Sequence, residues 1–303
     1  MTMPRPPRQS SRAPLEAQEL TGSSDTKGSE SALKAILLVA VILPLCVLAV
    51  LIGDTIIKGW ERLDLSLLFD SQGITAAESG LYHAIVGSMW LMALTALIAV
   101  PLGIGAAIYL EEYAPKNGLT RLIEVNITNL AGVPSIVYGL LGLAVFVRFS
   151  GLGPSVLAGA LTLSLLILPV IITASREALR SVPPSLREAS YALGADRFAT
   201  IRRVVLPMSL PSILTGVILA VSRAVGETAP IIVVGAAALT TRPAAGPLDR
   251  YEALPVSIYS MTSSTSEWHT LAAAGIVVLL AFLLSLNALA IYLRNRFQRR
   301  AEY

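Results

Sequence analysis

Arg223 and Glu227 stand four residues apart inside a long apolar run, in the stretch RAVGETAP of residues 223–230. Residues i and i+4 of a helix share a face, so the two side chains can form an ion pair. A charged side chain at the centre of a bilayer costs about 2.5–3.5 kcal/mol, so such residues face a protein interior or a wet cavity. A guanidinium group can bind two oxygens of an oxyanion at once. The pair is therefore a candidate anion site, with a structural ion pair as the alternative.

Neutral polar residues near this pair extend the candidate pathway. Thr228 follows Glu227 and, with Pro230, can loosen the helix and free a backbone group. Gly226 permits the close approach of another helix or of a ligand. Ser135 and Tyr138 stand in another apolar run and can add hydrogen bonds. The alternative for the serine is a bond to its own helix, and for the tyrosine it is packing.

The composition places these residues in a membrane protein. Of the 303 residues, 54% are hydrophobic and only 14% are charged, whereas soluble domains carry about 25% charged residues. A helix needs about 20 apolar residues to cross the hydrocarbon core. The sequence predicts six spans, at about 35–57, 84–110, 125–147, 154–175, 208–238 and 270–293. Residues 32–298 form one predicted transmembrane domain.

The distribution of basic residues predicts the orientation of these spans. Of the 23 lysines and arginines, 17 lie before the first span, in 111–124, in 176–203 or after the last span, five lie in the loops on the other side, and Arg223 lies inside a span. Basic loops stay in the cytoplasm, so both termini are predicted to be cytoplasmic. Residues 1–31 are rich in Pro, Ser and Arg, and we expect a disordered tail. Residues 299–303 form a short C-terminal tail.

Several kinds of chemistry are absent from the sequence. No Gly-Lys dipeptide occurs, so there is no Walker A loop for ATP. The two histidines, His83 and His269, have no cysteine or second histidine near them, which argues against a metal site. The basic residues are dispersed, which argues against nucleic acid binding. We expect no enzyme activity and no cofactor bound by this chain.

The predicted cytoplasmic loop 176–207 carries a patterned segment. Pro183 and Pro184 end the preceding helix, and Ser185 stands three residues before Glu188, a spacing typical of a capping box that starts a new helix. Leu186, Ala189 and Leu193 form an apolar strip on the new helix, with Arg187 and Glu188 beside it. Gly194 suits a C-terminal cap. The pattern leaves two alternatives, a connector on the bilayer surface and a docking helix for a cytoplasmic partner.

The spacing in this loop resembles the EAA loop of ABC importer permeases. Glu188-Ala189-Ser190, then Gly194, then Val204, Leu206 and Pro207 match that pattern, with Ser190 and Val204 as mild departures. The resemblance implies a coupling helix that docks on a separate ATPase, which uses ATP and Mg. The docking residues it implies are Leu186, Arg187, Glu188, Ala189, Ser190, Leu193 and Gly194.

Two further stretches narrow the resemblance. NLAGVPSIVYGLLG (residues 129–142) and RAVGETAP are similar to segments of phosphate importer permeases, and GETAP is closer to the A-type subunit than to its C-type partner. The resemblance implies an all-α type I ABC importer permease (MetI-like) with six transmembrane helices, in the inner membrane of bacteria. It also implies a heterodimer with a C-type permease, two ATPase subunits and an extracytoplasmic phosphate-binding protein.

Three alternatives remain open at this point. The first is an ABC permease for another oxyanion, such as molybdate, tungstate or sulfate, because arginine does not distinguish these anions by charge alone. The second is a proton-coupled secondary carrier that uses Glu227 as its proton site. The third is a membrane scaffold that reports phosphate status, a role that can coexist with transport.

Overall fold

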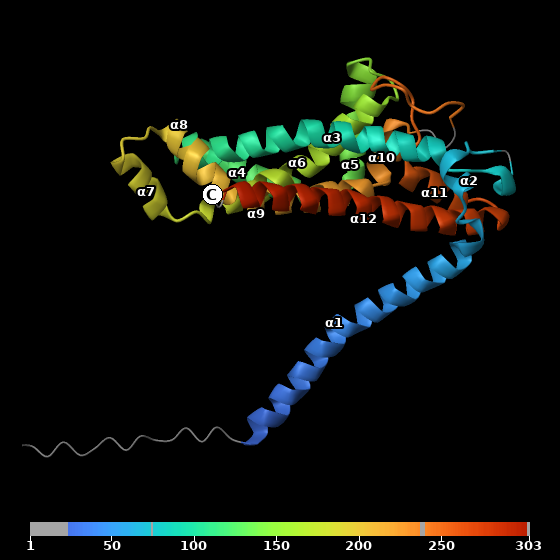
Figure 1. Ribbon diagram of the computed structural model, residues 1–303, viewed down its shortest axis with the longest axis horizontal. Coiled ribbons are helices and arrows are strands. Elements are labelled where there is room, and N and C mark those ends of the chain that lie inside the picture. The colour runs from blue at the N-terminus through green and yellow to red at the C-terminus, as the bar shows by residue number, and fades with distance from the viewer. Residues whose placement is uncertain (1–23, 74, 237–239, 302–303) are drawn as a thin grey trace, which may run out of the picture. The chain divides into compact units, whose positions relative to one another are not determined.

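The computed structural model describes residues 24–73, 75–236 and 240–301, and this part of the chain is helical with no β-strand (Figure 1). It divides into two units, one ending at Gly53 and the other beginning at Asp54, and each is described by itself. The α-helices of the described residues are α1 (Ser24–Gly59), α2 (Leu65–Phe69), α3 (Tyr82–Ile108), α4 (Gly118–Leu130), α5 (Ser135–Gly142), α6 (Val156–Arg180), α7 (Pro184–Ala192), α8 (Arg197–Thr200), α9 (Leu206–Val225), α10 (Ala229–Val234), α11 (Leu254–Thr262) and α12 (Glu267–Ala301).

Short turns of other helix types extend several of these elements. Two are 3₁₀ turns, η1 (Trp60–Arg62) and η2 (Ala76–Glu78). Three are π-helical, η3 (Tyr109–Tyr113), η4 (Leu143–Phe149) and η5 (Ile201–Val205). Because η5 joins α8 to α9, residues 197–225 form one uninterrupted helical span.

Five of the described helical segments are long and apolar enough to cross a membrane, or up to six if one bent pair is counted. They are Glu30–Arg62, Tyr82–Tyr113, Val156–Arg180, Arg197–Val225 and Glu267–Arg296. Each overlaps an apolar run predicted from the sequence. A helix suits such a run because it satisfies the backbone polar groups within the segment. Helix α1 already begins at Ser24, so residues 24–31 of the predicted tail are helical. Residues 1–23 of that tail lie outside the described residues.

Helix α6 lies at the centre of the second unit, between α3 and α9 (Figure 1). Leu163, Ile167 and Ile171 of α6 are fully buried. A Cβ added at Gly103 of α3 would lie 2.5 Å from Cγ2 of Ile171, so only glycine fits at this crossing. Small residues let membrane helices pack closely, and close packing is what holds them together in lipid.

The predicted third span, 125–147, is not one straight helix. The structure has α4 and α5 with η4 instead, bent by 104° at the break between Leu130 and Ser135. Pro134 explains the break, because it has no N–H to donate and it disfavours the α conformation at Val133. The predicted third span is thus present as a bent pair of helices rather than as one straight helix.

The predicted fifth span, 208–238, is also interrupted. Helix α9 ends at Val225, and α10 begins at Ala229. The ring of Pro230 would clash with the carbonyl group four residues earlier, at Gly226, so a continuous helix is disfavoured here. Residues 237–238 of the predicted span lie outside the described residues. The break falls directly beside the candidate anion site.

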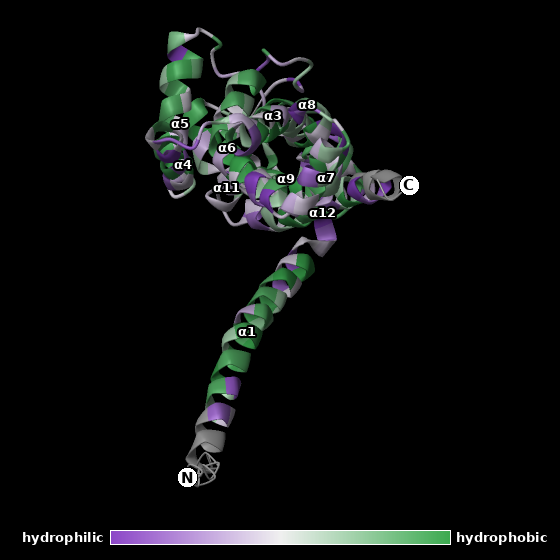
Figure 2. Cartoon of the chain, turned by 90° about the vertical axis from the view of Figure 1, so that its left-hand side faces the viewer, coloured by the Kyte–Doolittle hydropathy of each residue, from purple (hydrophilic) through white to green (hydrophobic). Residues whose placement is uncertain are grey.

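The second unit has two distinct ends along its long axis (Figure 1). Helices α7 and α8 lie at one end together with the last turns of α12, and α2 and α11 lie at the other. We call these the α7 end and the α2 end. Figure 2 looks at the α7 end, where hydrophilic residues gather on α7 and α8. The predicted topology makes the α7 end cytoplasmic.

A buried carboxyl group holds the loop before α11 in place at the α2 end. The Glu252 residue is 2% exposed, and its Oε1 accepts hydrogen bonds from the backbone N–H and, at 2.9 Å, from the hydroxyl of Thr240. The Nδ1 atom of His83 lies 3.1 Å from the Thr240 carbonyl oxygen. Burial raises the pKa of Glu252, while its bonds to Thr240 and the nearby His83 act in the opposite direction.

This pKa shift predicts a pH-dependent contribution to stability. A carboxyl group whose pKa is raised by folding binds more protons in the folded state, so its contribution falls as the pH rises from the unfolded pKa, about 4.3, through the raised folded value. We expect Glu252→Gln to remove part of this decline. The measurement is Tm against pH for both proteins, with His83 kept in each. Parallel curves for the two proteins would contradict the prediction.

Candidate functional site

The Arg223–Glu227 ion pair is present in the structure. The Nε atom of Arg223 lies 3.2 Å from Oε1 of Glu227. The arginine side chain is 54% exposed on this chain, while that of Glu227 is 17% exposed. The two residues do not share one continuous helix, because α9 ends at Val225 and Glu227 lies in the break before α10. The guanidinium group therefore points away from the core of its own chain.

The neighbouring helix α12 gives the depth of this pair. The hydroxyl of Ser222 donates a hydrogen bond to Oδ1 of Asn287. Asn287 lies roughly 30 Å along α12 from Glu267 and about 14 Å from Arg296, at 1.5 Å per residue. Asn287 therefore lies inside the span Glu267–Arg296 and away from both of its ends. Arg223, next to Ser222, is therefore deep inside the membrane-spanning region.

The two signature stretches of the sequence meet in the structure. Helix α5, from residues 129–142, packs against α10, which follows Glu227. A Cβ added at Gly139 would lie 2.7 Å from the Cα of Pro230, so the two backbones touch at this glycine. At Gly226, by contrast, the nearest atom to an added Cβ is the Arg223 carbonyl oxygen, 3.9 Å away. Gly139 rather than the predicted Gly226 makes the close approach within this chain.

The neutral residues of the predicted pathway have different surroundings. Tyr138 is 7% exposed, and its hydroxyl donates to the Leu130 carbonyl at 2.8 Å. This bond ties α5 to the end of α4 across the bend. Ser135 is the first residue of α5 and is half-buried. Thr228 is also half-buried, and its hydroxyl lies 3.4 Å from the Gly226 carbonyl oxygen.

The contact between α5 and α10 gives a prediction about stability. Gly139→Ala places a methyl group against the Pro230 backbone, so the two helices must separate, and overpacking costs about 1–3 kcal/mol. We expect a lower Tm for the purified protein. Gly105→Ala in α3 is the matched control, because nothing lies within 4 Å of its added Cβ. An equal Tm for both variants would contradict the close contact.

Helix α7 begins two residues earlier than the predicted capping box requires. Its first residue is Pro184 and its N-cap is Pro183, which makes no side-chain capping bond. The predicted cap at Ser185 is therefore wrong, because proline at the first position already supplies helical φ and needs no N–H partner. The predicted glycine cap is confirmed: Gly194 has φ +85°, and its N–H donates to the Tyr191 carbonyl at 2.9 Å. That left-handed conformation favours glycine.

The predicted docking residues divide into an exposed group and an anchoring group. Glu188, Ala189, Leu193 and Gly194 are exposed, with Leu193 at 88%. Leu186 packs against the hydrophobic core, and the Ser190 hydroxyl lies 2.9 Å from that of Thr200 in α8. The sequence analysis missed two exposed aromatic residues of this segment, Tyr191 in α7 at 44% and Phe198 in α8 at 61%. We call the exposed group, with these two aromatics, the α7 surface.

Arg187 connects α7 to the bundle. Its Nη2 lies 2.9 Å from Oε1 of Glu112 and donates at the same distance to the Leu179 carbonyl, while Nη1 donates to the Val182 carbonyl at 3.1 Å. The side chains of Arg187 and Glu112 are 20% and 8% exposed. Arg187 thus links α7 to η3 and to the end of α6. These contacts favour an anchoring role for Arg187 over the predicted docking role.

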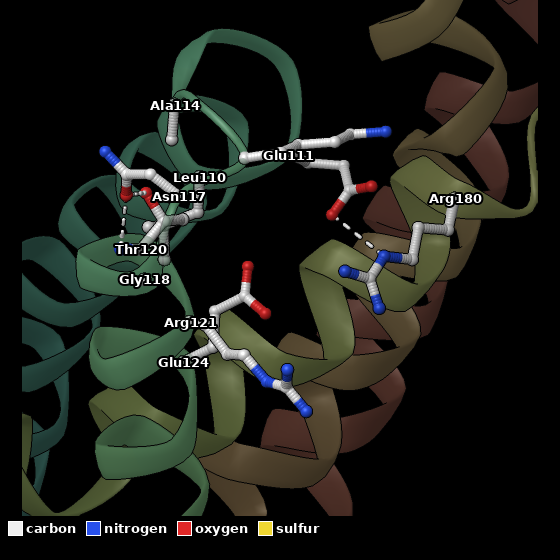
Figure 3. A pocket seen from close by; sticks show the side chains of 10 residues that line it. Leu110, Glu111, Ala114, Asn117, Gly118, Thr120, Arg121, Glu124 and Arg180 are labelled. Carbon is white, nitrogen blue, oxygen red and sulfur yellow. Dashed lines mark hydrogen bonds and ion pairs between the residues drawn. The ribbon is translucent and has the colours of Figure 1, made fainter.

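A second group of ion pairs lies near this link and was not found from the sequence. Arg176 of α6 pairs with Glu124 of α4 at 2.6 Å and with Glu111 of η3 at 3.5 Å. Arg180 pairs with Glu111 at 2.9 Å (Figure 3). These residues are dispersed over 70 positions of sequence, so no local spacing signals them. Among the described residues, no three His, Cys, Asp or Glu side chains are placed to hold a metal ion.

The described chain is thus a bundle of helices long and apolar enough to cross a membrane, with the exposed short helix α7 at one end. The chain belongs to the family of binding-protein-dependent transport system inner membrane components, which it matches over residues 99–301. It is therefore an inner membrane component of a transport system.

Bacterial permease proteins are similar in sequence to this chain over half or more of its length. The phosphate transport system permease protein PstA of Yersinia pestis is 37% identical over 248 residues, which cover 78% of this chain and 80% of that protein. PstA 1 of Mycobacterium tuberculosis H37Rv is 45% identical over 154 residues, 51% of this chain. The match covers 50% of the length of that Mycobacterium tuberculosis protein.

Solved structures share the fold. A bacterial alginate ABC transporter, in complex with a pentasaccharide-bound periplasmic protein, has a chain that superposes with a TM-score of 0.64 at 15% identity, over 90% of this chain and 97% of that one. The MetNI methionine ABC transporter, in an inward facing conformation, gives a TM-score of 0.57 at 20% identity, over 73% and 97%. These likenesses concern the fold alone, and they confirm the predicted type I ABC importer permease architecture.

Proposed function

We propose that this chain is the translocation subunit of an ATP-driven importer of inorganic phosphate. The observation that carries the proposal is the 37% identity to a phosphate permease over 78% of the chain. The sequence has no Walker A loop, so ATP and Mg are used by two separate ATPase subunits. A C-type permease completes the pathway as a heterodimer, and an extracytoplasmic phosphate-binding protein delivers the anion. Transport, and no reaction of its own, is the role of this chain.

The exposure of Arg223 supports both a partner and a pathway. Its side chain is 54% exposed at a depth where a lipid-facing charge is costly. This face of α9 therefore meets water or the second permease rather than lipid. The guanidinium group offers paired donors to phosphate oxygens, while Glu227 holds it when no anion is present. Binding must stay weak, because a conduit has to release what it binds.

The contacts of α7 with the bundle suggest how a movement driven by ATP hydrolysis would be transmitted to Arg223. The ATPase docks on the α7 surface and moves it. Arg187 transmits the movement to η3, which continues α3, through Glu112, and Ser190 transmits it to α8 through Thr200. Residues 197–225 form one helical span that carries Arg223 near its far end. Movement of α7 would therefore shift Arg223 and change the side to which the pathway opens.

Uptake by the reconstituted assembly tests the proposal. Vesicles containing both permeases and the ATPase, with the binding protein supplied outside, should accumulate labelled phosphate only with ATP inside. Molybdate, tungstate and sulfate are the competitors for the oxyanion alternative. Uptake driven by a proton gradient without ATP, or uptake of another oxyanion in preference to phosphate, would overturn the proposal.

Leu193→Asp is the matching test of the docking surface. Leu193 is 88% exposed, so its replacement should leave the fold intact while placing a charge in an apolar contact. We expect ATPase co-purification and phosphate uptake both to fall at least tenfold, equivalent to about 1.4 kcal/mol. Leu119→Asp on α4, at a leucine that is 65% exposed, is the control. Normal ATPase association in the Leu193 variant would exclude this surface as the docking site.

A further inference from the structure

A charged pocket of ≈ 550 Å³ lies at the α7 end, between η3, the start of α4 and the end of α6 (Figure 3). It is separate from Arg223, which is not among its residues. The charged side chains that line it are Glu111, Lys116, Arg121, Glu124 and Arg180. The proposed transport function uses none of them.

The charges of this pocket do not cancel. Both carboxylates are already paired: Glu124 with Arg176 at 2.6 Å, and Glu111 with Arg180 at 2.9 Å. Lys116 and Arg121 are exposed and make no ion pair with any described residue. Two positive charges are therefore left to attract an anion into the pocket.

Neutral donors complete the site. Helix α4 begins in the pocket, where Gly118 lines it beside the N-cap Asn117. The first N–H groups of a helix attract anions, because they lack intrahelical partners and lie at the positive end of the helix dipole. The Asn117 side-chain oxygen accepts from the Thr120 N–H at 2.9 Å, so the donors left for an anion are the N–H groups of Gly118 and Leu119. The combination of cationic side chains and a helix start suits a phosphate group better than a carboxylate, because phosphate offers more acceptor oxygens.

We propose that this pocket binds a phosphate group, either inorganic phosphate or the headgroup phosphate of an anionic lipid, through Lys116 and Arg121. The bound anion would join the start of α4 to Arg180, which pairs with Glu111. The next residue, Glu112, pairs with Arg187 and so anchors α7. Occupancy would thus restrain the connection between the ATPase docking helix and the bundle. On the predicted topology the pocket opens to the cytoplasm, so free phosphate would act there as a feedback ligand. Binding of a phosphate group rests on the pocket alone, while its feedback role rests on the proposed function.

The test measures binding to the whole assembly in nanodiscs, without nucleotide and without the external binding protein. The probes are labelled inorganic phosphate in neutral-lipid discs and phosphatidylglycerol retained on purification. The variant is Lys116→Gln with Arg121→Gln, and the control is Arg148→Gln, an exposed arginine at the end of η4. Each lost charge-assisted contact should weaken binding roughly tenfold.

The two probes separate the sources of the phosphate group. Saturable phosphate binding in neutral discs that the double variant loses, and the control keeps, identifies inorganic phosphate as the ligand. Phosphatidylglycerol retention that follows the same pattern, with no such phosphate binding, identifies the lipid. If the double variant and the control behave alike with both probes, the proposal is overturned. An equal Tm for the two variants establishes that the pocket, rather than the fold, was changed.

Discussion

Arg223→Ala should lower phosphate uptake by the reconstituted assembly at least tenfold while leaving the assembly intact. Charge-assisted hydrogen bonds are worth about 1.5–3 kcal/mol each, and 1.4 kcal/mol is about a factor of ten. The side chain is 54% exposed on this chain, so its removal leaves no cavity in the core. The measurement is initial uptake per assembly at several phosphate concentrations, with ATPase association quantified in parallel.

Two further variants sharpen this result. Arg223→Lys keeps the charge but loses the planar pair of donors, so we expect uptake between that of the alanine variant and the unaltered protein. Arg148→Ala removes an exposed arginine at the end of η4 and should change nothing. Uptake by Arg223→Ala equal to that of Arg148→Ala would leave the ion pair with a purely structural role.

The second large effect is expected at Arg187. Arg187→Ala leaves the Glu112 carboxylate, only 8% exposed, without its partner, and it also removes the donors to two carbonyl groups. Removing one partner of a buried ion pair lowers the free energy of unfolding by about 3–5 kcal/mol. Because Arg187 is itself 20% exposed, we expect a loss at the lower end of this range, seen as a lower Tm of the purified assembly.

A pair of companion variants separates anchoring from docking. Arg187→Met combined with Glu112→Gln removes both charges, so it should be less destabilised than Arg187→Met alone. Arg202→Ala, at an exposed arginine in η5, controls for loss of basic charge near the membrane. If Arg187→Ala kept its Tm but lost ATPase association, Arg187 would be a docking residue rather than an anchor.

These two arginines illustrate what the ABC permease pattern can and cannot predict. The EAA spacing correctly places a short helix at α7, closed by Gly194. It does not reveal that Arg187 turns toward Glu112, because that residue lies 75 positions earlier in the chain. The exposed aromatic side chains of Tyr191 and Phe198 are missed for a similar reason. Exposure depends on how the loop folds back on α8, which local periodicity does not contain.

The sequence by itself determined the membrane class, the number of apolar runs, their predicted orientation and the Arg223–Glu227 pairing. These follow from local quantities: the length of an apolar run, the charge of a loop and the short separation of two opposite charges. The pair forms although α9 ends between the two residues.

Only the tertiary structure decided where the helices stop and which residues meet. The breaks at Pro134 and Pro230 lie in stretches apolar enough to continue, and proline in a membrane helix is compatible with either a kink or a break. The outcome rests on packing: Gly139 lets α5 and α10 touch at Pro230, and Tyr138 ties α5 to α4. The ion-pair network at the α7 end has the same origin, because oppositely charged residues far apart in sequence become partners only when α3, α4 and α6 pack together.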